Sequence, residues 1–175
     1  MDRVVNFSHG DVVKVHTRQL EAFKKIAREN QDKKRYRLCL HDSPDNKLQD
    51  MIICMSAGDY ARPHKHHNMP ESHMILAGRM AIVLFDDDGV VTDAFVMDRG
   101  SDYLAYRVNA DVYHMTILLS DSAIEYEVKP GPFEPSNNIF PLWAPSGENK
   151  RDAMEFMKRT RERIFERFPH LRADV

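Results

Sequence analysis

Two kinds of hydrophobic spacing alternate along the chain. Apolar residues at positions 20, 23, 26 and 27 have the spacing of an amphipathic helix over Thr17–Gln31, and Thr17 is a suitable N-cap. The same spacing returns over residues 148–168, with apolar side chains at 153, 157 and 164, and Pro169 ends it. The sequence therefore predicts one helix near the N-terminus and one near the C-terminus.

The region between these helices has the spacing of strands. Alternating or continuous apolar segments are separated by turn signals, and Asp88-Gly89 is a strong hairpin signal among them. The segments are 35–41, 47–55, 73–85, 90–97, 103–108, 112–119 and 123–129. A series of seven or eight short strands is typical of an all-β sandwich or barrel. Residues 130–145 contain five of the nine prolines, which predicts an extended arm.

Length and charge narrow the class of protein. The 175 residues are enough for one domain, with a helical segment (1–34), a barrel (35–130) and an arm with the second helix (131–175). A net charge of −2 gives no basic footprint for nucleic acid or for a membrane surface. No apolar run is long enough to span a bilayer, and the N-terminus lacks the layout of a signal peptide. Cys39 and Cys54 are expected to be reduced core thiols, so we predict a cytoplasmic protein.

One polar stretch is unusual in this series of strands. Four of the nine histidines lie between His64 and His73, together with Glu71. In an extended chain, His64 and His66 point to the same side and His67 points to the other. Two adjacent strands would then bring His64, His66 and Glu71 to one point, where imidazole and carboxylate suit Zn, Fe, Ni, Cu or Mn. A polar loop that is rich in histidine is the alternative.

Two further histidines are candidates for the same site. His114 lies in the apolar segment 112–119, where an imidazole needs either a metal or a hydrogen-bond partner. His73 follows Glu71 by two residues, and it is a candidate fifth ligand or a partner that orients a ligand. For each of them, a hydrogen-bonded histidine without a metal is the alternative.

The spacing of these residues resembles the first motif of the cupin superfamily, G-x5-H-x-H-x(3,4)-E-x6-G. Every fixed position is matched, by Gly58, His64, His66, Glu71 and Gly78. The resemblance implies a single cupin barrel, also called a double-stranded β-helix or jelly roll. It also implies one divalent transition metal, with Fe, Zn, Mn and Ni as the candidates.

The second cupin motif, G-x5-P-x-G-x2-H-x3-N, is present in degraded form. Asn109 and Asp111 stand in place of its Pro and Gly, and Leu118 stands in place of its Asn. His114 keeps the histidine position. The resemblance therefore implies a ligand set of His64, His66, Glu71 and His114.

Longer stretches resemble the WbuC-type cupin-fold metalloproteins. They are "RYRLCLH", "ARPHKH", "GRMAIVLFDDDG" and "EVKPGPFEP…WAPSG", and the similarity covers roughly residues 12–160. This resemblance implies a link to bacterial surface-polysaccharide (O-antigen) synthesis. Cupins often associate through their sheets, so it also implies a homodimer.

Other polar faces are candidates for the wall of the barrel. Arg35, Arg37 and His41 share one face of their strand, and either this face or the opposite, apolar face points inward. Inward-pointing arginines would bind a phosphate or carboxylate. Glu127 and Lys129 share a face that is either solvated or positioned to move a proton. Tyr60 and Tyr106 are candidate cavity phenols, with packing as the alternative.

Three functions are compatible with these residues. The first is a metal-dependent isomerase or epimerase that acts on a small sugar or sugar-phosphate, in which the arginines hold an anionic group. The second is a non-haem iron dioxygenase, since three histidines and a glutamate suit iron. The third is a non-catalytic cupin that binds a sugar or regulates another protein. All three predict a small-molecule partner, and an anionic sugar is the specific expectation.

Overall fold

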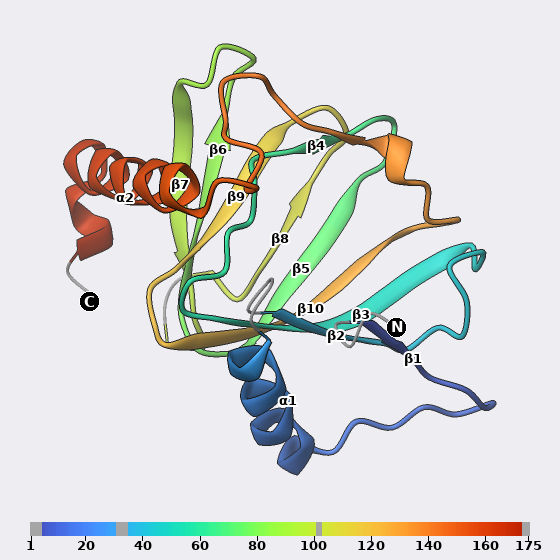
Figure 1. The fold of residues 1–175 in the computed structure, drawn as a ribbon. Coiled ribbons are helices and arrows are strands. Elements are labelled where there is room, and N and C mark those ends of the chain that lie inside the picture. The colour runs from blue at the N-terminus through green and yellow to red at the C-terminus, as the bar shows by residue number, and fades with distance from the viewer. Residues whose placement is uncertain (1–4, 31–34, 101–102, 173–175) are drawn as a thin grey trace.

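The computed structural model describes residues 5–30, 35–100 and 103–172 (Figure 1). The helices are α1 (Thr17–Glu29) and α2 (Lys150–Arg167). The strands are β1 (Val5–Phe7), β2 (Arg35–Cys39), β3 (Leu48–Ser56), β4 (Lys65–His66), β5 (Glu71–Ala77), β6 (Met80–Phe85), β7 (Val91–Met97), β8 (Ala105–Val108), β9 (Tyr113–Leu118), β10 (Ser122–Pro130) and β11 (Asn138–Ile139). Short 3₁₀ turns cover Pro135–Asn137 and Pro169–Arg172.

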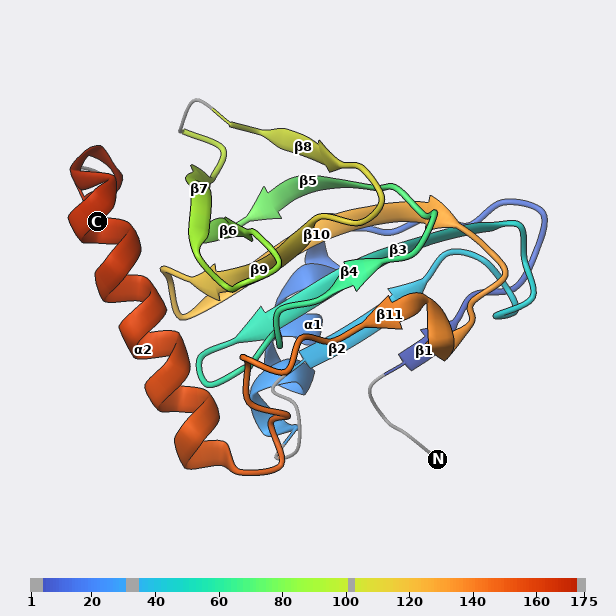
Figure 2. The ribbon, with the colours of Figure 1, turned by 90° about the horizontal axis from the view of Figure 1, so that it is seen from above.

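Two facing sheets form the body of the protein. The larger sheet has the strand order β1-β2-β3-β10-β5-β8, and the smaller one has the order β7-β6-β9. Helix α1 covers the outer face of the larger sheet at β2 and β3, and α2 covers the smaller sheet (Figures 1 and 2). This arrangement confirms the predicted fold, a single cupin β-barrel with a helix near each end of the chain.

Strand β3 is apolar along most of its length because both of its faces are covered. Ile52 and Cys54 point outward and pack with Phe23 of α1. Met51 and Ile53 point into the space between the sheets. A strand that is buried on both sides has no need of the polar alternation seen in half-exposed strands.

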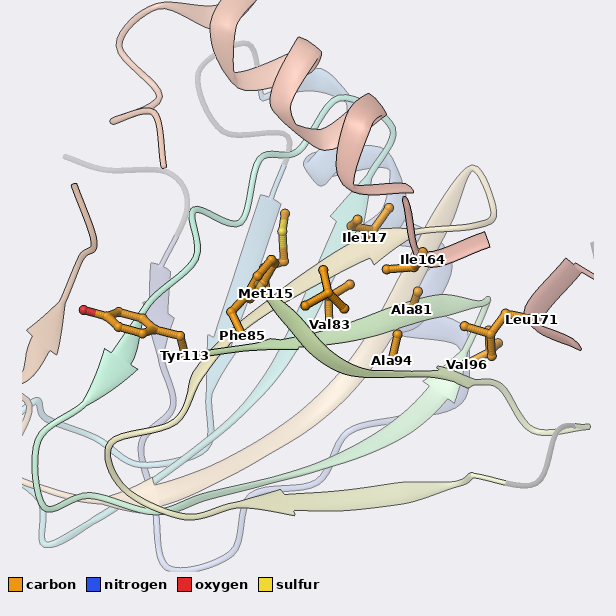
Figure 3. Close-up of a cluster of buried hydrophobic side chains, with 11 residues drawn as sticks. Ala81, Val83, Phe85, Ala94, Val96, Tyr113, Met115, Ile117, Ile164 and Leu171 are labelled. Carbon is orange, nitrogen blue, oxygen red and sulfur yellow. The ribbon is translucent and has the colours of Figure 1, made fainter. Parts of the chain in front are cut away.

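The smaller sheet is buried on both faces in the same way. Met80 and Ile82 of β6 face the larger sheet, whereas alternate residues of the same strand face α2. Figure 3 shows this outer cluster, in which Ile164 of α2 lies beside the strands. Its other labelled members are Ala81, Val83, Phe85, Ala94, Val96, Tyr113, Met115, Ile117 and Leu171. Neither described helix is long and apolar enough to cross a membrane.

The strand prediction was wrong at one corner. The segment 73–85 was expected to be a single strand, but it forms the end of β5 and all of β6, which belong to different sheets. The chain turns between them at Gly78, whose φ is +78°. Strand β1 was not expected, and it pairs in parallel with β2. The predicted arm is extended, and it also contains β11, which pairs with β4.

The N-terminal cap of α1 also differs from the prediction. His16, not Thr17, is the N-cap residue. Its ring Nδ1 accepts a hydrogen bond from the backbone N–H of Arg18 at 3.1 Å. The backbone N–H of His16 donates to the side chain of Gln19 at 2.6 Å, so the two residues cap each other reciprocally. The predicted end of this helix at Gln31 lies outside the described residues, as do residues 31–34 at the expected domain boundary.

Loss of this cap is expected to destabilise the protein slightly. His16→Ala should lower the free energy of unfolding by about 1 kcal/mol, because free N–H groups of the first turn lose their side-chain acceptor. Urea unfolding followed by circular dichroism measures the change. His9→Ala, at an exposed histidine outside the helix, is the control. Equal midpoints for the two variants would contradict a capping role for His16.

Both cysteines are free and buried. Burial raises the pKa of Cys39 to about 11 and that of Cys54 to about 12. Both thiols are therefore protonated at neutral pH, and neither has the reactivity of a catalytic thiolate.

Candidate metal centre

Four side chains from three segments of the chain meet in the barrel. One donor atom from each of His64, His66, Glu71 and His114 lies within 4.8 Å of the donor atoms of the others. His66 belongs to β4, Glu71 begins β5 and His114 lies in β9. His64 and His114 exchange two backbone hydrogen bonds, of 3.1 and 3.0 Å, which hold the two motifs together. The structure thus brings together all four residues of the expected ligand set.

The turn before β9 keeps its shape although the second motif has lost its glycine. Asp111 stands at the glycine position and has a φ of +66°, a left-handed conformation that Asp tolerates better than most residues. Its backbone N–H donates to the backbone oxygen of His66 at 3.0 Å. This bond fastens the turn beside one of the ligands, and His114 follows three residues later.

Backbone carbonyls fix the orientation of two imidazoles. Nδ1 of His64 lies 2.9 Å from the backbone oxygen of Arg62, and Nδ1 of His114 lies 3.0 Å from that of Val112. A carbonyl oxygen only accepts, so each Nδ1 carries the proton and each Nε2 offers a lone pair. Metal-bound histidines are commonly oriented by such second hydrogen bonds. Burial lowers the pKa of His64 to about 3, helped by the neighbouring His114, so this ring is neutral, as a metal ligand must be.

The donor set fits a divalent transition metal. Nε2 of His114 lies 2.7 Å from Glu71 Oε1, and Nε2 of His66 lies 3.0 Å from Glu71 Oε2. All three side chains are buried, and Nε2 of His66 has no hydrogen-bond partner. The close approach of His114 Nε2 and Glu71 Oε1 is favourable when the two atoms share a bound cation or when Nε2 carries a proton that it donates to the carboxylate. Imidazole nitrogen and carboxylate oxygen are ligands that Zn, Fe, Mn and Ni accept.

His73 lies beside the ligands and contacts two carboxylates. Its Nε2 is 3.3 Å from Glu71 Oε1, and its Nδ1 is 3.2 Å from Glu125 Oε2. Its ring stacks on Tyr106, with 4.7 Å between the ring centroids. Burial alone would lower the pKa of His73, but Glu125 and Glu71 raise it well above its usual value. His73 thus has the geometry of a partner that orients Glu71. The exposed His67 contacts none of these groups.

The candidate ligands line a cavity of about 990 Å³. The polar face of β2 also lines it, which decides between the two orientations that the sequence left open. Tyr36 points the other way and packs on Phe23 of α1, with 4.9 Å between the ring centroids. Because α1 covers the apolar face of β2, Arg35, Arg37 and His41 point into the barrel.

The two arginines differ in their partners. Arg35 is paired with Asp59, whose Oδ2 lies 2.6 Å from its Nη2 and 2.8 Å from its Nε. Arg37 makes no hydrogen bond or ion pair with any described residue. Burial lowers the pKa of Arg37, and the positive charge of Arg35 lowers it further. Glu127 and Asp59 offset part of this effect from a distance, but no carboxylate of a described residue forms an ion pair with Arg37.

The remaining candidate residues also line the cavity. Lys129 Nζ lies 2.8 Å from Glu127 Oε1 and 4.0 Å from Glu71 Oε2, which places this pair next to the ligands. A nitrogen of the His41 ring lies 2.9 Å from the backbone oxygen of Asp50. The hydroxyl of Tyr60 donates to the backbone oxygen of Pro145 in the arm, and burial raises its pKa to about 12. Tyr60 thus helps to hold the arm.

Two functional neighbours were not identified in the sequence. Asp59 holds Arg35, and Glu125 holds His73. Asp59 directly follows the first glycine of the cupin motif, but nothing local marks it as the partner of a residue 24 positions earlier. Glu125 alternates with Glu127, so its inward position follows once the direction of β10 is known.

Comparison with known proteins gives limited similarity. A family profile described as "Domain of unknown function (DUF6016)" matches residues 15–97. No curated protein matches the chain. Among solved structures, oxalate oxidase in complex with the substrate analogue glycolate is similar with a TM-score of 0.44 and 12% identity, over 54% of this chain and 46% of that one. The chain thus spans less than half the length of that oxalate oxidase.

Two bacterial proteins are similar to the same degree. KdgF from Halomonas sp. has a TM-score of 0.45 and 15% identity, over 58% of this chain and 82% of its own. Bacillus subtilis oxalate decarboxylase has a TM-score of 0.44 and 16% identity, over 54% and 24%. The fold and the site together define a cupin-fold protein with a candidate metal site. The WbuC-type relationship, the link to polysaccharide synthesis and the homodimer stay predictions.

Proposed function

We propose that the protein is a metal-dependent isomerase or epimerase that acts on a small anionic sugar or sugar-phosphate. One observation carries this proposal: the candidate ligands share a cavity with Arg37, a cation that makes no direct ion pair with any described residue. A cavity of about 990 Å³ has room for a small molecule. A bound divalent metal would supply a Lewis acid that polarises a hydroxyl or carbonyl oxygen.

Arg37 would hold the anionic group of the substrate. Its guanidinium stays charged although its surroundings disfavour the charge. A carboxylate or phosphate beside it would remove this penalty and form charge-assisted hydrogen bonds. Arg35, which already has Asp59 as a partner, would keep Arg37 in place and contribute less to binding.

Glu127 and Lys129 would handle the proton. Burial raises the pKa of Glu127, but the charge of Lys129 lowers it, and the net pKa is about 2. The carboxylate is therefore ionised at neutral pH and able to accept a proton. Burial lowers the pKa of Lys129, but Glu127 and Glu71 raise it overall, so the ammonium is available as a donor. Isomerisation removes a proton at one atom and adds one at another, and it needs such a pair. The weak basicity of Glu127 explains why a Lewis acid would be needed to acidify the substrate.

Substitution of Arg37 tests the binding part of this proposal. In isothermal titration of the metal-loaded protein with glucose 6-phosphate, Arg37→Gln should weaken binding by about tenfold or more, because a charge-assisted hydrogen bond is lost. Arg107→Gln, at an exposed position of β8, is the control and should bind as the wild type does. Equal affinities for the two variants would contradict an anion site at Arg37.

Deuterium exchange tests the reaction. The metal-loaded protein is incubated with aldose and ketose phosphates in D2O, and carbon-bound deuterium is followed by NMR. An isomerase or epimerase incorporates deuterium, and Glu127→Gln should abolish the incorporation. Oxygen uptake by the iron-loaded protein would instead support the dioxygenase hypothesis. Binding with neither exchange nor oxygen uptake would support a sugar-binding or regulatory protein.

A further inference from the structure

The arm between β10 and α2 places two aromatic side chains at the cavity. It runs back along the barrel through β11 (Figure 2), where Asn138 and Ile139 pair with His66 and Lys65 of β4. This ladder fastens the arm directly beside a metal-ligand candidate. Phe133 and Phe140 of the arm line the cavity, and each is 46% exposed. We call these two residues the aromatic rim.

The ring of Phe140 is fixed next to the candidate metal centre. Its centroid lies 6.0 Å from that of His64, and the guanidinium carbon of Arg62 lies 4.9 Å from it. Arg62 also donates through Nη2 to the backbone oxygens of Pro141 and Ala144, at 2.8 and 3.2 Å. The same arginine therefore anchors the arm just after Phe140 and packs against the ring itself. Nearly half of this immobilised aromatic surface nevertheless stays uncovered.

From this geometry we infer that the aromatic rim is a ring-binding subsite. The substrate carries, besides the anionic group held at Arg37, a ring whose flat apolar face stacks on Phe140. This inference rests on the proposed function for the position of the anion. The ring is either aromatic or the C–H face of a sugar, because both present a flat apolar surface to an aromatic side chain.

Two features of the cavity support a substrate of this size. Its volume of about 990 Å³ lies at the upper end of the range for drug-sized ligands, which leaves space beyond one small sugar. The wall of the cavity also has a charged part and an apolar part. Arg37, Glu127 and Lys129 are charged, whereas Phe133 and Phe140 are apolar. A ligand with one anionic part and one ring matches both kinds of wall. A rigid aromatic side chain binds a ring with little loss of conformational entropy.

Three phosphate esters with a common anionic head test the subsite. Methyl phosphate, phenyl phosphate and glucose 1-phosphate are titrated calorimetrically into the metal-loaded full chain. We expect phenyl phosphate or glucose 1-phosphate to bind the wild type about tenfold more tightly than methyl phosphate. In Phe140→Ala this gain should fall to less than about twofold, while the affinity for methyl phosphate is unchanged. A gain with phenyl phosphate alone identifies an aromatic ring, and a gain with glucose 1-phosphate alone identifies a sugar ring.

Matched variants separate stacking from folding. Leu142→Ala removes a fully exposed side chain of the same arm that does not line the cavity, so it should keep the gain. Phe140→Trp should keep it as well, because an aromatic face is retained. The inference is overturned if the wild type binds all three esters equally well. It is also overturned if Phe140→Ala keeps the tighter binding of the esters that carry a ring.

The outcome also separates this inference from the proposed function. If the ring adds nothing to the affinity but Arg37→Gln still weakens the binding of methyl phosphate, the ring-binding subsite is contradicted and the anion site at Arg37 is supported. If Phe140→Ala removes the gain but Arg37→Gln has no effect, the subsite stands and the anion site fails. Binding of none of the three esters overturns both.

Discussion

His66→Ala is expected to remove the bound metal, whereas His67→Ala is expected to leave it in place. Wild-type protein should carry about one equivalent of a divalent transition metal per chain, and His66→Ala less than about a tenth of that. His66 is 4% exposed, and its Nε2 faces Glu71 at 3.0 Å. The side chain of His67 is 62% exposed and faces Asp111. The two variants thus remove an imidazole from neighbouring residues whose side chains point to opposite sides of the chain.

Elemental analysis of protein purified without a metal-chelating tag measures the effect. The protein is stripped of metal and then reloaded with Fe, Mn, Ni or Zn in separate samples. Thermal unfolding is a second readout, because a metal that binds only the folded state raises its melting temperature. This rise should be present in the wild type and in His67→Ala, and absent in His66→Ala. Similar melting of all three metal-free proteins would exclude misfolding as the cause.

Each result bears on the proposed chemistry. Zinc or manganese would direct the next assays to sugar isomerisation, and iron would direct them to oxygen. A wild-type protein that takes up none of the four metals would contradict the metal-dependent function. Equal metal contents in His66→Ala and His67→Ala would contradict the ligand set, because His66 has three close candidate partners and His67 has none.

Three of the four candidate ligands lie close together in the sequence, whereas His114 was indicated by its apolar segment and by the resemblance to the second cupin motif. His64 and His66 are two residues apart and Glu71 begins the next strand of the larger sheet, so their spacing alone brings them close. The orientation of β2 could not be predicted in this way. Both of its faces carry plausible residues, and the choice depends on α1, which packs on Tyr36. That Arg37 has no direct ion pair among the described residues depends in turn on Asp59 pairing with Arg35.

The errors in the fold have similar causes. The segment 73–85 is mostly apolar, and only the short Gly78-Arg79 step interrupts it where the chain passes from the larger sheet to the smaller one. The three residues of β1 are too few to give a periodic signal. His16 is not among the residue types that usually cap a helix, so the sequence favours the neighbouring Thr17 as the N-cap. In the degraded second motif, Asp111 has a φ of +66°, and His114 lies beside the other candidate ligands although the motif has lost its Pro and Gly.

Gly78→Ala is expected to lower the free energy of unfolding by more than about 3 kcal/mol, which is a large effect for one methyl group. Gly78 has a φ of +78°, and a Cβ atom there would lie 2.1 Å from the backbone oxygen of Ser122 and 2.8 Å from Cα of Ala123. Both contacts are with backbone atoms of β10, the central strand of the larger sheet next to β5. Neither can move aside by a change of rotamer, so β10 or the corner itself has to shift.

Gly10→Ala is the matched control for this substitution. Gly10 also has a positive φ, of +114°, but a Cβ atom there would meet nothing within 4 Å. Both variants place an alanine in a conformation that L-residues avoid, at a cost of about 1–2 kcal/mol. Only Gly78→Ala adds a steric clash. The difference between their unfolding free energies, measured by urea denaturation, therefore reports the clash.

The same variant links the fold to the metal centre. The corner at Gly78 joins β5, which begins with Glu71, to β6, which pairs with the strand that carries His114. Glu71 lies at the far end of β5 and His114 pairs with Leu84 near the far end of β6, so a shift of this corner would reach these two candidate ligands along the strands. We expect Gly78→Ala to bind metal more weakly than Gly10→Ala, even at a temperature where both are folded. If the two variants are equally stable and bind metal equally well, β10 relaxes without strain, and the close approach at Gly78 is not what determines this corner.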